Sequence, residues 1–474
     1  MSLPAVTIPQ WSDPRAGERA DDGGFDWIDV DLGEHRYLRT IGEAFDTGTL
    51  RLWVEREHAA GTFSRTSSGG LITAVLPFRG SRVAVVWSDF RVNAASFAHE
   101  NSRRFSAFLS HLARERGKPV PLIYVVNSAG LSLMAGRAVF TDAFALWPAI
   151  LDYAERHLVL TCAVGKCLGL APLLFGLGHY RIAVAGQTHI NLTGPEVLSL
   201  FFEPGFDFAA GAAAERAHGR NDLIHEIVPS VDDALARFRD LLSADPGPAP
   251  MDGALGTLLA SFLDADPLEL IPGWCGTVRL FLGRRRGAPI GVFANPPGRP
   301  NNLVTVRTLE KYAAGLDLFR ALAVPIVSFL DSPGIDPRFE QGDANNMRKI
   351  LWVGEKIIRY PHGAMGVAAG RCFGGASTLG FPRVFGSVRA VALRGCRIGT
   401  MHERIIGRVL QQSPRLLAQW HQVAAKQAAD LADLLADGTL DAVVDPWQLG
   451  DEVDTFLEQI RAPRLALAVG DGAP

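Results

Sequence analysis

A glycine-rich heptapeptide occurs twice in this chain, and its residue types suit the binding of anionic oxygen atoms. The first copy is Gly165-Lys166-Cys167-Leu168-Gly169-Leu170-Ala171, and the second is Gly370-Arg371-Cys372-Phe373-Gly374-Gly375-Ala376. Both copies follow the pattern glycine, cation, cysteine, large apolar residue, glycine, variable residue, alanine, and they are 205 residues apart. Glycines at the start of a helix leave backbone N–H groups exposed, and exposed N–H groups hold anions. The repeat therefore predicts two similar oxygen-binding turns.

Two adjacent N–H groups at a helix start can stabilise an oxygen atom that gains negative charge during a reaction. Losing one such donor raises the barrier by about 3–4 kcal/mol. We predict that the catalytic donors are the amides of Gly169 and Leu170 in the first turn and of Gly375 and Ala376 in the second. Gly374 and Gly375 leave room for a flat ligand, whereas the side chain of Leu170 is expected to narrow the approach in the first copy. Two such holes suit two carbonyl oxygens, such as a thioester that becomes an enolate and a carbonyl on the exchanged group.

Other residues could contribute to catalysis, but the sequence favours no covalent nucleophile. Cys167 and Cys372 lie in apolar turns without a neighbouring histidine, so packing is the favoured role for both, with a nucleophilic role kept open. The chain contains neither a GxSxG elbow nor an HExxH zinc motif, and we expect no metal. His189 and His218 are candidate general bases, although a lone histidine is more often structural. Asp331, at the end of an apolar run, could orient a substrate or cap the following turn.

The repeat extends to the elements that must position these turns. The apolar runs at 121–130 and 324–334 predict buried strands that enter turns, and Gly130 and Gly334 are 204 residues apart. Each run is preceded by a shorter apolar run and a long amphipathic stretch, and is followed by a helix-like segment: Val83–Trp87, Ser96–Arg116 and Ala138–His157 in the first half, and Ile290–Ala294, Val306–Ala323 and Asn345–Tyr360 in the second. This alternation predicts an α/β fold with largely parallel strands. Duplication of a fold without shared chemistry is the alternative, but it would not need to keep the glycine–cation–cysteine turn.

Composition and charge limit the class of protein. The chain has 474 residues, 48% of them hydrophobic and 20% charged, which is enough for two compact domains. A formal net charge of −3 gives no electrostatic support for nucleic-acid or membrane binding, and the basic run at 284–286 is more typical of a solvated loop. Five cysteines without CxxC spacing argue against a disulfide framework or a zinc ribbon. With no leader or membrane-spanning run, we expect a cytoplasmic protein.

Composition also predicts where the chain divides. Residues 1–25 carry several prolines and the run Asp21-Asp22-Gly23-Gly24, which is typical of a flexible N-terminal arm. The segment Ser243–Pro250 has the alternating proline and small-residue composition of a linker. We therefore predict an N-terminal domain at 26–248 and a C-terminal domain at 249–474.

From about Val83 to about Thr400, the chain resembles the carboxyltransferase (beta) subunit of biotin-dependent acyl-CoA carboxylases, a branch of the crotonase-like superfamily. The segments that carry the resemblance are Thr193-Gly194-Pro195-Glu196-Val197, Ala294-Asn295-Pro296-Pro297, Phe329-Leu330-Asp331-Ser332-Pro333-Gly334 and Phe373-Gly374-Gly375-Ala376. The resemblance implies two tandem crotonase-like domains built from ββα spiral units. It also implies active sites where the N-domain of one chain faces the C-domain of another.

The resemblance assigns roles to the two turns. It implies that acyl-CoA lies mainly on the N-domain, with its thioester oxygen at Gly169 and Leu170. Carboxybiotin would lie mainly on the C-domain, with its ureido oxygen at Gly375 and Ala376. The carboxylate would move from N1 of biotin to the α-carbon through an enolate-like intermediate, without a metal. We assign the neighbouring residues to substrate binding, namely Gly130, Thr193, Gly194, Gly334 and Gly374. The implied partners are biotin carboxylase, the biotin carboxyl carrier protein and a second copy of the chain, in a homodimer or a higher oligomer.

The sequence also departs from the family pattern. The stretch Asn127–Ser132 lacks an arginine that the family usually has, and Arg394-Gly395-Cys396-Arg397 replaces an acidic stretch; the zinc ribbon of some bacterial members is absent. These departures favour a divergent member with an altered acyl group or with a carrier-bound thioester, and the charge reversal at Arg397 would suit an anionic substrate or carrier. Two alternatives stay open. One is a biotin-independent malonyl-type thioester decarboxylase, and the other is a non-catalytic degenerate subunit that partners an active carboxyltransferase.

Overall fold

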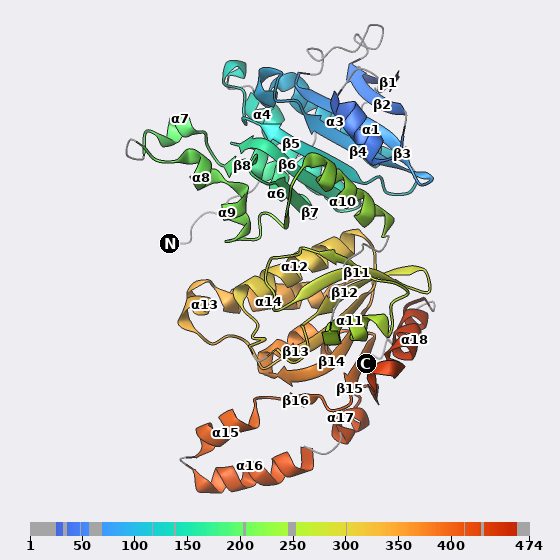
Figure 1. Cartoon of the computed structure of the whole chain (residues 1–474), viewed down its shortest axis with the longest axis vertical. Helices are drawn as coiled ribbons and strands as arrows, with labels where there is room; N and C mark the ends of the chain where they lie inside the picture. Colours follow the sequence, from blue (N-terminus) through green and yellow to red (C-terminus); the bar gives the residue numbers. More distant parts are fainter. Residues whose placement is uncertain are drawn as a thin grey trace, which may run out of the picture.

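The two halves expected from the repeat are seen in a computed structural model of the chain. It describes residues 25–31, 36–47, 49–55, 69–115, 117–136, 139–201, 205–244, 253–299, 301–411, 413–427 and 431–461. The halves lie one above the other along the long axis of the molecule, and each is built on one mixed β-sheet (Figure 1). The predicted N-terminal arm lies outside the described residues except for Phe25, which begins the first strand. The predicted domain boundary at 248 also lies outside them.

The first half contains a nine-stranded sheet with the order β1-β2-β3-β4-β5-β6-β7-β9, and β8 pairs with β6. Strands β1 to β4 are antiparallel, and the pairs from β4 onward are parallel. The strands are β1 (Phe25–Asp31), β2 (Thr49–Glu55), β3 (Leu71–Phe78), β4 (Ser81–Ser88), β5 (Leu122–Ser128), β6 (Val159–Leu168), β7 (Tyr180–Val184), β8 (His189–Asn191) and β9 (Glu226–Val228).

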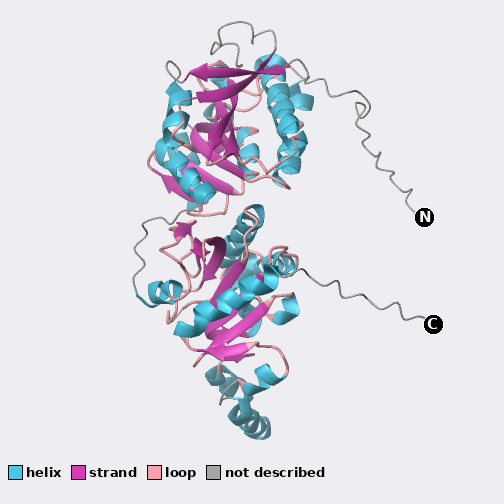
Figure 2. Ribbon diagram, turned by 90° about the vertical axis from the view of Figure 1, so that its right-hand side faces the viewer, coloured by secondary structure: helices cyan, strands magenta, loops and turns pink. Residues whose placement is uncertain are grey.

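Helices lie on both sides of this sheet (Figure 2). They are α1 (Arg36–Ala44), α3 (His99–Arg114), α4 (Val139–Phe144), α5 (Leu146–Ala154), α6 (Ala171–Gly176), α7 (Pro195–Leu198), α8 (Phe208–Ala212), α9 (Ala214–His218) and α10 (Val231–Ser243), with the short 3₁₀ turns η1 (Asn93–Ala95) and η2 (Leu133–Ala135).

The second half repeats this plan with an eight-stranded sheet of order β10-β11-β12-β13-β14-β15-β17, in which β16 pairs with β14. Its strands are β10 (Leu268–Leu270), β11 (Arg279–Arg285), β12 (Ala288–Ala294), β13 (Ile326–Ser332), β14 (Ala364–Phe373), β15 (Arg389–Leu393), β16 (Arg397–Gly399) and β17 (Ala442–Val444). Its helices are α11 (Gly253–Ala260), α12 (Val306–Ala321), α13 (Phe339–Asp343), α14 (Asn346–Ile358), α15 (Glu403–Leu410), α16 (Pro414–Gln427), α17 (Ala432–Ala436) and α18 (Leu449–Arg461), with the 3₁₀ segments η3 (Gly374–Gly380), η4 (Arg383–Phe385) and η5 (Pro446–Gln448).

The predicted α/β class and the internal repeat are confirmed. Strands β4 to β9 correspond in order and direction to β12 to β17. The correspondence includes the two short side strands, β8 and β16, which lie outside the main strand order of each sheet. Parallel pairs predominate in both sheets, as expected, although the strands before β4 and β12 are antiparallel and make the sheets mixed. The single helix predicted at 138–157 is wrong, because two helices, α4 and α5, meet at Ala145. Pro148 lies in the first turn of α5, where its missing N–H is harmless, whereas it would break a continuous helix.

The two halves share one hydrophobic core and a buried polar contact. One continuous apolar cluster contains residues of β4 to β7 and of β11 to β14. Tyr180 of β7 is fully buried, and its hydroxyl donates to Glu226 at 2.6 Å and accepts from the N–H of Ile271 at 3.0 Å. Arg237 bonds Glu226 and also donates to the carbonyl of Glu269 in the second half. Buried polar groups of this kind fix one arrangement because each partner would otherwise be left unpaired.

The packing of α12 on its sheet predicts the effect of a single methyl group. Gly315 lies on α12, where an added Cβ would be 2.3 Å from Cδ2 of Leu280 and 2.7 Å from the ring of Phe293. We expect Gly315→Ala to lower the free energy of unfolding by about 1–3 kcal/mol through overpacking. The matched control is Gly407→Ala on α15, where nothing lies within 4 Å of the added atom. It should raise stability by about 0.5–1 kcal/mol. Urea denaturation measures both, and a Gly315→Ala variant as stable as Gly407→Ala would contradict the packing.

Candidate active site

Each heptapeptide lies where a central strand changes neighbours. In β6, Leu160–Ala163 pair with β7, but Lys166–Leu168 pair with β8. In β14, Met365–Ala368 pair with β15, but Arg371–Phe373 pair with β16. The register against β5 and β13 also shifts at this point in both halves. The glycine that begins each motif therefore lies at the division of the strand.

A side-chain oxygen from the neighbouring strand holds each division. Asn127 of β5 accepts the backbone N–H of Lys166 through Oδ1 at 3.0 Å, and Asp331 of β13 accepts the backbone N–H of Arg371 at 2.9 Å. An added Cβ on Gly165 would lie 2.8 Å from Oδ1 of Asn127, and one on Gly370 would lie 2.7 Å from the carboxylate of Asp331. The first glycine of each motif is therefore required because this side chain occupies the space beside it.

Asp331 makes more contacts than its counterpart. Its carboxylate also accepts from Nε of Arg371 at 2.8 Å and from the N–H of Gly298 at 2.8 Å, which ties β13 to the loop after β12. Burial alone would raise the pKa of Asp331, but the hydrogen bonds from Arg371 and Gly298 outweigh it and hold the pKa below its ordinary value. Asp331 therefore positions the second turn. The partners of its carboxylate are Gly298 and Arg371 and not the residues that follow it, so Asp331 does not cap the following turn.

In the first half, two backbone turns meet. Gly130 has a φ of +96° and Gly169 a φ of +63°, and an added Cβ on either would lie 3.1–3.2 Å from the Cα of the other. The N–H of Gly169 is already donated to the carbonyl of Asn191 at 3.2 Å. Of the two predicted donors in this half, Leu170 keeps an N–H with no acceptor among the described residues, and Leu131 in the adjacent turn has another. The side chain of Leu170 is buried in the core and does not narrow the approach as expected.

In the second half, the corresponding turns are more open. Gly374 and Gly375 are exposed, and both lie at the start of η3, where N–H groups have no intrahelical acceptor. The N–H of Ile335, in the turn that follows Gly334, likewise has no acceptor among the described residues. Ile335 lies against the turn, since an added Cβ on Gly375 would be 2.8 Å from its Cδ1. Ala376 is buried one residue further into η3, where the i→i+3 hydrogen bonds begin.

The remaining predicted residues lie at the edges of these turns. Thr193 and Gly194 follow β8, and an added Cβ on Gly194 would be 3.8 Å from Leu168, so they border the first turn. His189 pairs with Lys166 across the β6–β8 ladder and also lies at this edge. His218 is further along, with Nδ1 3.0 Å from the carbonyl of Ile224.

Both motif cysteines are buried in the core. Burial raises the pKa of the Cys167 and Cys372 thiols well above the ordinary value, so both stay protonated. Packing is therefore the better supported role. In the part of the chain that the structure describes, no group of three or more His, Cys, Asp or Glu residues is placed to bind a metal ion. Nor does this part contain a helix with both the length and the apolarity to cross a membrane.

Sequence reasoning named Asp331 as a candidate but missed its relation to Asn127. The two residues are 204 positions apart, in register with the repeat, and each is the polar residue at the end of an apolar strand. That pattern could have identified them as a pair. Nothing in the side chains of Leu131 and Ile335 could have marked their backbone N–H groups, because these are left unpaired by the bridges that their neighbours make.

Comparisons with known proteins agree with this architecture. No family model matches the chain. It is similar to the beta6 subunit of the biotin-dependent acetyl-/propionyl-coenzyme A carboxylase of Mycobacterium tuberculosis, with 22% identity over 467 residues, 90% of this chain and 94% of the relative. The propionyl-CoA carboxylase beta chain of Saccharopolyspora erythraea is 22% identical over 380 residues, which cover 71% of this chain and 64% of the relative.

Solved structures show the same fold at low sequence identity. The crystal structure of transcarboxylase 12S, a hexamer with hydrolysed methylmalonyl-coenzyme A bound, matches with a TM-score of 0.75 and 18% identity over 87% of this chain and 86% of that chain. A single-chain, multi-domain long-chain acyl-CoA carboxylase matches with a TM-score of 0.66 and 18% identity over 85% of this chain and 42% of that chain. The chain is thus similar, at low identity, to the beta subunits of acyl-CoA carboxylases, and it shares the two-sheet α/β fold of transcarboxylase 12S.

The contacts of Asp331 predict how stability responds to acid. Because its folded-state pKa is depressed, the carboxylate adds stability above the ordinary carboxyl pKa, and this contribution is lost as the pH falls through the folded value. Asp331→Asn keeps an acceptor for the backbone N–H of Arg371, as Asn127 does, but removes the ion pair. We expect the variant to lose about 1–3 kcal/mol at pH 7 and to show a flatter decline below about pH 4.

Urea denaturation at a series of pH values tests this expectation. Asp266→Asn, at an exposed carboxylate, is the control and should follow the wild type. An Asp331→Asn variant whose pH profile is parallel to that of the wild type would show that the ion pair with Arg371 does not depress the pKa.

Proposed function

We propose that this protein is a carboxyltransferase that moves a carboxyl group between carboxybiotin and the α-carbon of an acyl thioester. The observation that carries the proposal is the pair of exposed glycines, Gly374 and Gly375, at a helix start beside Ile335, whose N–H has no acceptor in the part of the chain that the structure describes. An equivalent pair of turns lies in the first half. A relative that is similar over 90% of this chain is described as a subunit of a biotin-dependent carboxylase.

The second half has the features expected of a biotin site. Because Gly374 and Gly375 carry no side chain, a flat ring can approach the backbone edge-on, and bound biotin would supply the carboxyl group. The N–H groups of Gly375 and Ile335 would hold its ureido oxygen, and Ala376, which was also predicted as a donor, would support the turn from the core. Gly334 would complete the binding surface on the side of β13.

The first half would hold the acyl thioester, as acyl-CoA or bound to a carrier protein. The N–H of Leu170 and that of Leu131 would point at the thioester oxygen, with Gly169 fixing the turn through its bond to Asn191. Fixed dipoles aimed at an oxygen that gains charge stabilise an enolate without needing to reorganise. Gly130, Thr193 and Gly194 would line the approach.

The proposal includes the arrangement of chains and their partners. We place the division between the domains at 248/249, and we infer a cytoplasmic protein that works with a biotin carboxylase and a biotin carboxyl carrier protein. In the homologue family, each site is expected between the first half of one chain and the second half of another. Exposed apolar side chains on η2 and α14, including Leu133, Met134 and Leu351, would suit such a contact. A homodimer is the minimum assembly.

An exchange assay tests the proposal. The purified protein is incubated with malonyl-CoA or methylmalonyl-CoA that carries ¹⁴C in the carboxyl group to be transferred, together with free biotin or a biotinylated carrier. The transfer of label to an unlabelled acyl-CoA acceptor is then measured. Transfer that requires biotin supports the carboxyltransferase. Release of labelled CO₂ without biotin would instead identify a malonyl-type thioester decarboxylase, which needs only the first turn. Neither transfer nor release with these thioesters would favour a degenerate, non-catalytic subunit.

The role of the Gly375 amide can be tested at a single position. Gly375→Pro removes the N–H, and proline is tolerated in the first turn of a helix. Gly375→Ala adds the same Cβ against Ile335 but keeps the N–H, so it is the matched control. We expect the proline variant to lose about a hundredfold or more in kcat relative to the alanine variant. Equal rates for the two variants would exclude this amide as a donor.

A further inference from the structure

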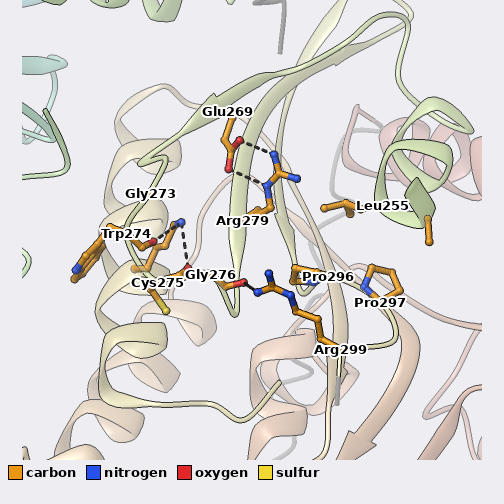
Figure 3. Close-up of a pocket in the computed structure, with 12 residues that line it drawn as sticks. Leu255, Glu269, Gly273, Trp274, Cys275, Gly276, Arg279, Pro296, Pro297 and Arg299 are labelled. Atoms are coloured by element: carbon orange, nitrogen blue, oxygen red, sulfur yellow. Dashed lines mark hydrogen bonds and ion pairs between the residues drawn. The ribbon is translucent and has the colours of Figure 1, made fainter. Parts of the chain in front are cut away.

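A cavity of about 490 Å³ lies in the second half, beside the β12–α12 loop. It is bounded by α11, the loop Gly273–Gly276, β11, the β12–α12 loop and α12. In Figure 3, Trp274 lies on one side and Leu255, Pro296 and Pro297 lie on the other, with the Glu269–Arg279 pair and Arg299 between them. Its size and its mixed apolar and polar lining are those of a small-molecule site.

A buried cation without a counter-ion forms part of the wall. Lys311 is only 2% exposed, and its Nζ donates to the carbonyl of Trp274 at 2.7 Å and approaches that of Cys275 at 3.5 Å. An ammonium group has three N–H donors, so at least one remains for a ligand. No carboxylate of the described residues pairs with it. A buried charge without a partner is costly, so this site is electrostatically incomplete.

The other two cations of the cavity differ in their partners. Arg279 is neutralised by Glu269, with contacts of 2.9 Å from Nε and 2.5 Å from Nη2. Arg299 donates Nη1 to the carbonyl of Gly276 at 2.8 Å, and within the described part of the chain no carboxylate neutralises it. Two positive charges, on Lys311 and Arg299, therefore remain uncompensated in one cavity.

We propose that this cavity binds a small dianion, either a short-chain dicarboxylate or a phosphate-bearing small molecule. One negative charge pairs with Lys311 and the other with Arg299, while the apolar part of the ligand contacts Trp274 and Leu255. The site uses no residue of either glycine turn, although its loop is joined to the second motif by the bond from Arg371 to the carbonyl of Arg299.

Calorimetric titration of the wild-type protein tests the proposal, with succinate, inorganic phosphate and neutral succinamide as probes. We expect saturable binding of succinate or phosphate and no binding of succinamide, because the diamide has the same length but no charge. Binding of succinate alone identifies a carboxylate site, and binding of phosphate alone identifies a phosphate site. Absence of saturable binding for both dianions, or equal binding of succinamide, overturns the proposal.

Two variants locate the site. Arg299→Gln removes one charge at an exposed position and keeps a donor for the carbonyl of Gly276, so we expect a folded protein with affinity lowered about tenfold or more. Arg359→Gln, at the exposed residue that follows α14, is the control and should bind as the wild type does. Lys311→Met should abolish binding, but it also removes the hydrogen bond to the carbonyl of Trp274. If the Lys311→Met protein does not fold, the result for Arg299→Gln decides the test. Unchanged affinity in Arg299→Gln places the ligand elsewhere and overturns the assignment.

The pH dependence gives an independent check. Burial lowers the pKa of Lys311 to about 8, opposed by the neighbouring Cys275 and Glu269 and assisted by Arg279. Because the ammonium form binds an anion, affinity should be high near pH 7 and should fall as the pH rises from about 8 to 9. Arg299 keeps its charge throughout this range. An affinity that is constant from pH 7 to 9 would show that Lys311 does not contact the ligand.

Discussion

One hydrogen bond, made twice, determines the geometry of both candidate sites. In the first half, Asn127 of β5 accepts the backbone N–H of Lys166 at 3.0 Å. In the second half, Asp331 of β13 accepts the backbone N–H of Arg371 at 2.9 Å. This contact lies where the register of β6 against β5, and of β14 against β13, shifts. On its opposite edge, each strand passes from one neighbour to the next within the same few residues. The following turn then presents its own N–H groups at the sheet edge. The glycine that begins each motif is a consequence, since any Cβ there would occupy the space of the accepting side chain.

The two copies of this arrangement have diverged in charge and exposure. Asn127 is neutral, and Lys166 beside it is exposed. In the second copy, Asp331 is buried and paired with Arg371, whose Nη2 also donates to the carbonyl of Arg299. The ion pair therefore secures three segments, β13, β14 and the loop after β12, around a turn whose glycines are themselves exposed. A rigid frame around an open turn suits a ligand that arrives on a carrier, because the donors must be in place before it binds.

Much of this fold could be predicted from the sequence, because apolar periodicity marks buried strands directly. The 204-residue spacing of Gly130 and Gly334 aligned the two halves of the repeat. Helices α3, α12 and α14 lie within a few residues of their expected bounds. The site was less predictable. The N–H of Ile335 has no acceptor among the described residues because its neighbours Gly334 and Asp336 make the hydrogen bonds to Val304. That arrangement depends on tertiary structure and cannot be inferred from the local sequence. Likewise, the sequence could not show that the N–H of Gly169 is already donated to the carbonyl of Asn191 at the end of β8.

The contact between the halves connects the features that sequence reasoning treated separately. Tyr180 bonds Glu226, Glu226 accepts from Arg237, and Arg237 donates to the carbonyl of Glu269, whose carboxylate pairs with Arg279 at the wall of the cavity. Glu269 is thus held by the first half through its backbone and serves the cavity through its side chain. Because it neutralises Arg279, it leaves Lys311 and Arg299 as the uncompensated charges. The backbone of the residue that neutralises Arg279 is therefore held in place by a contact from the first half.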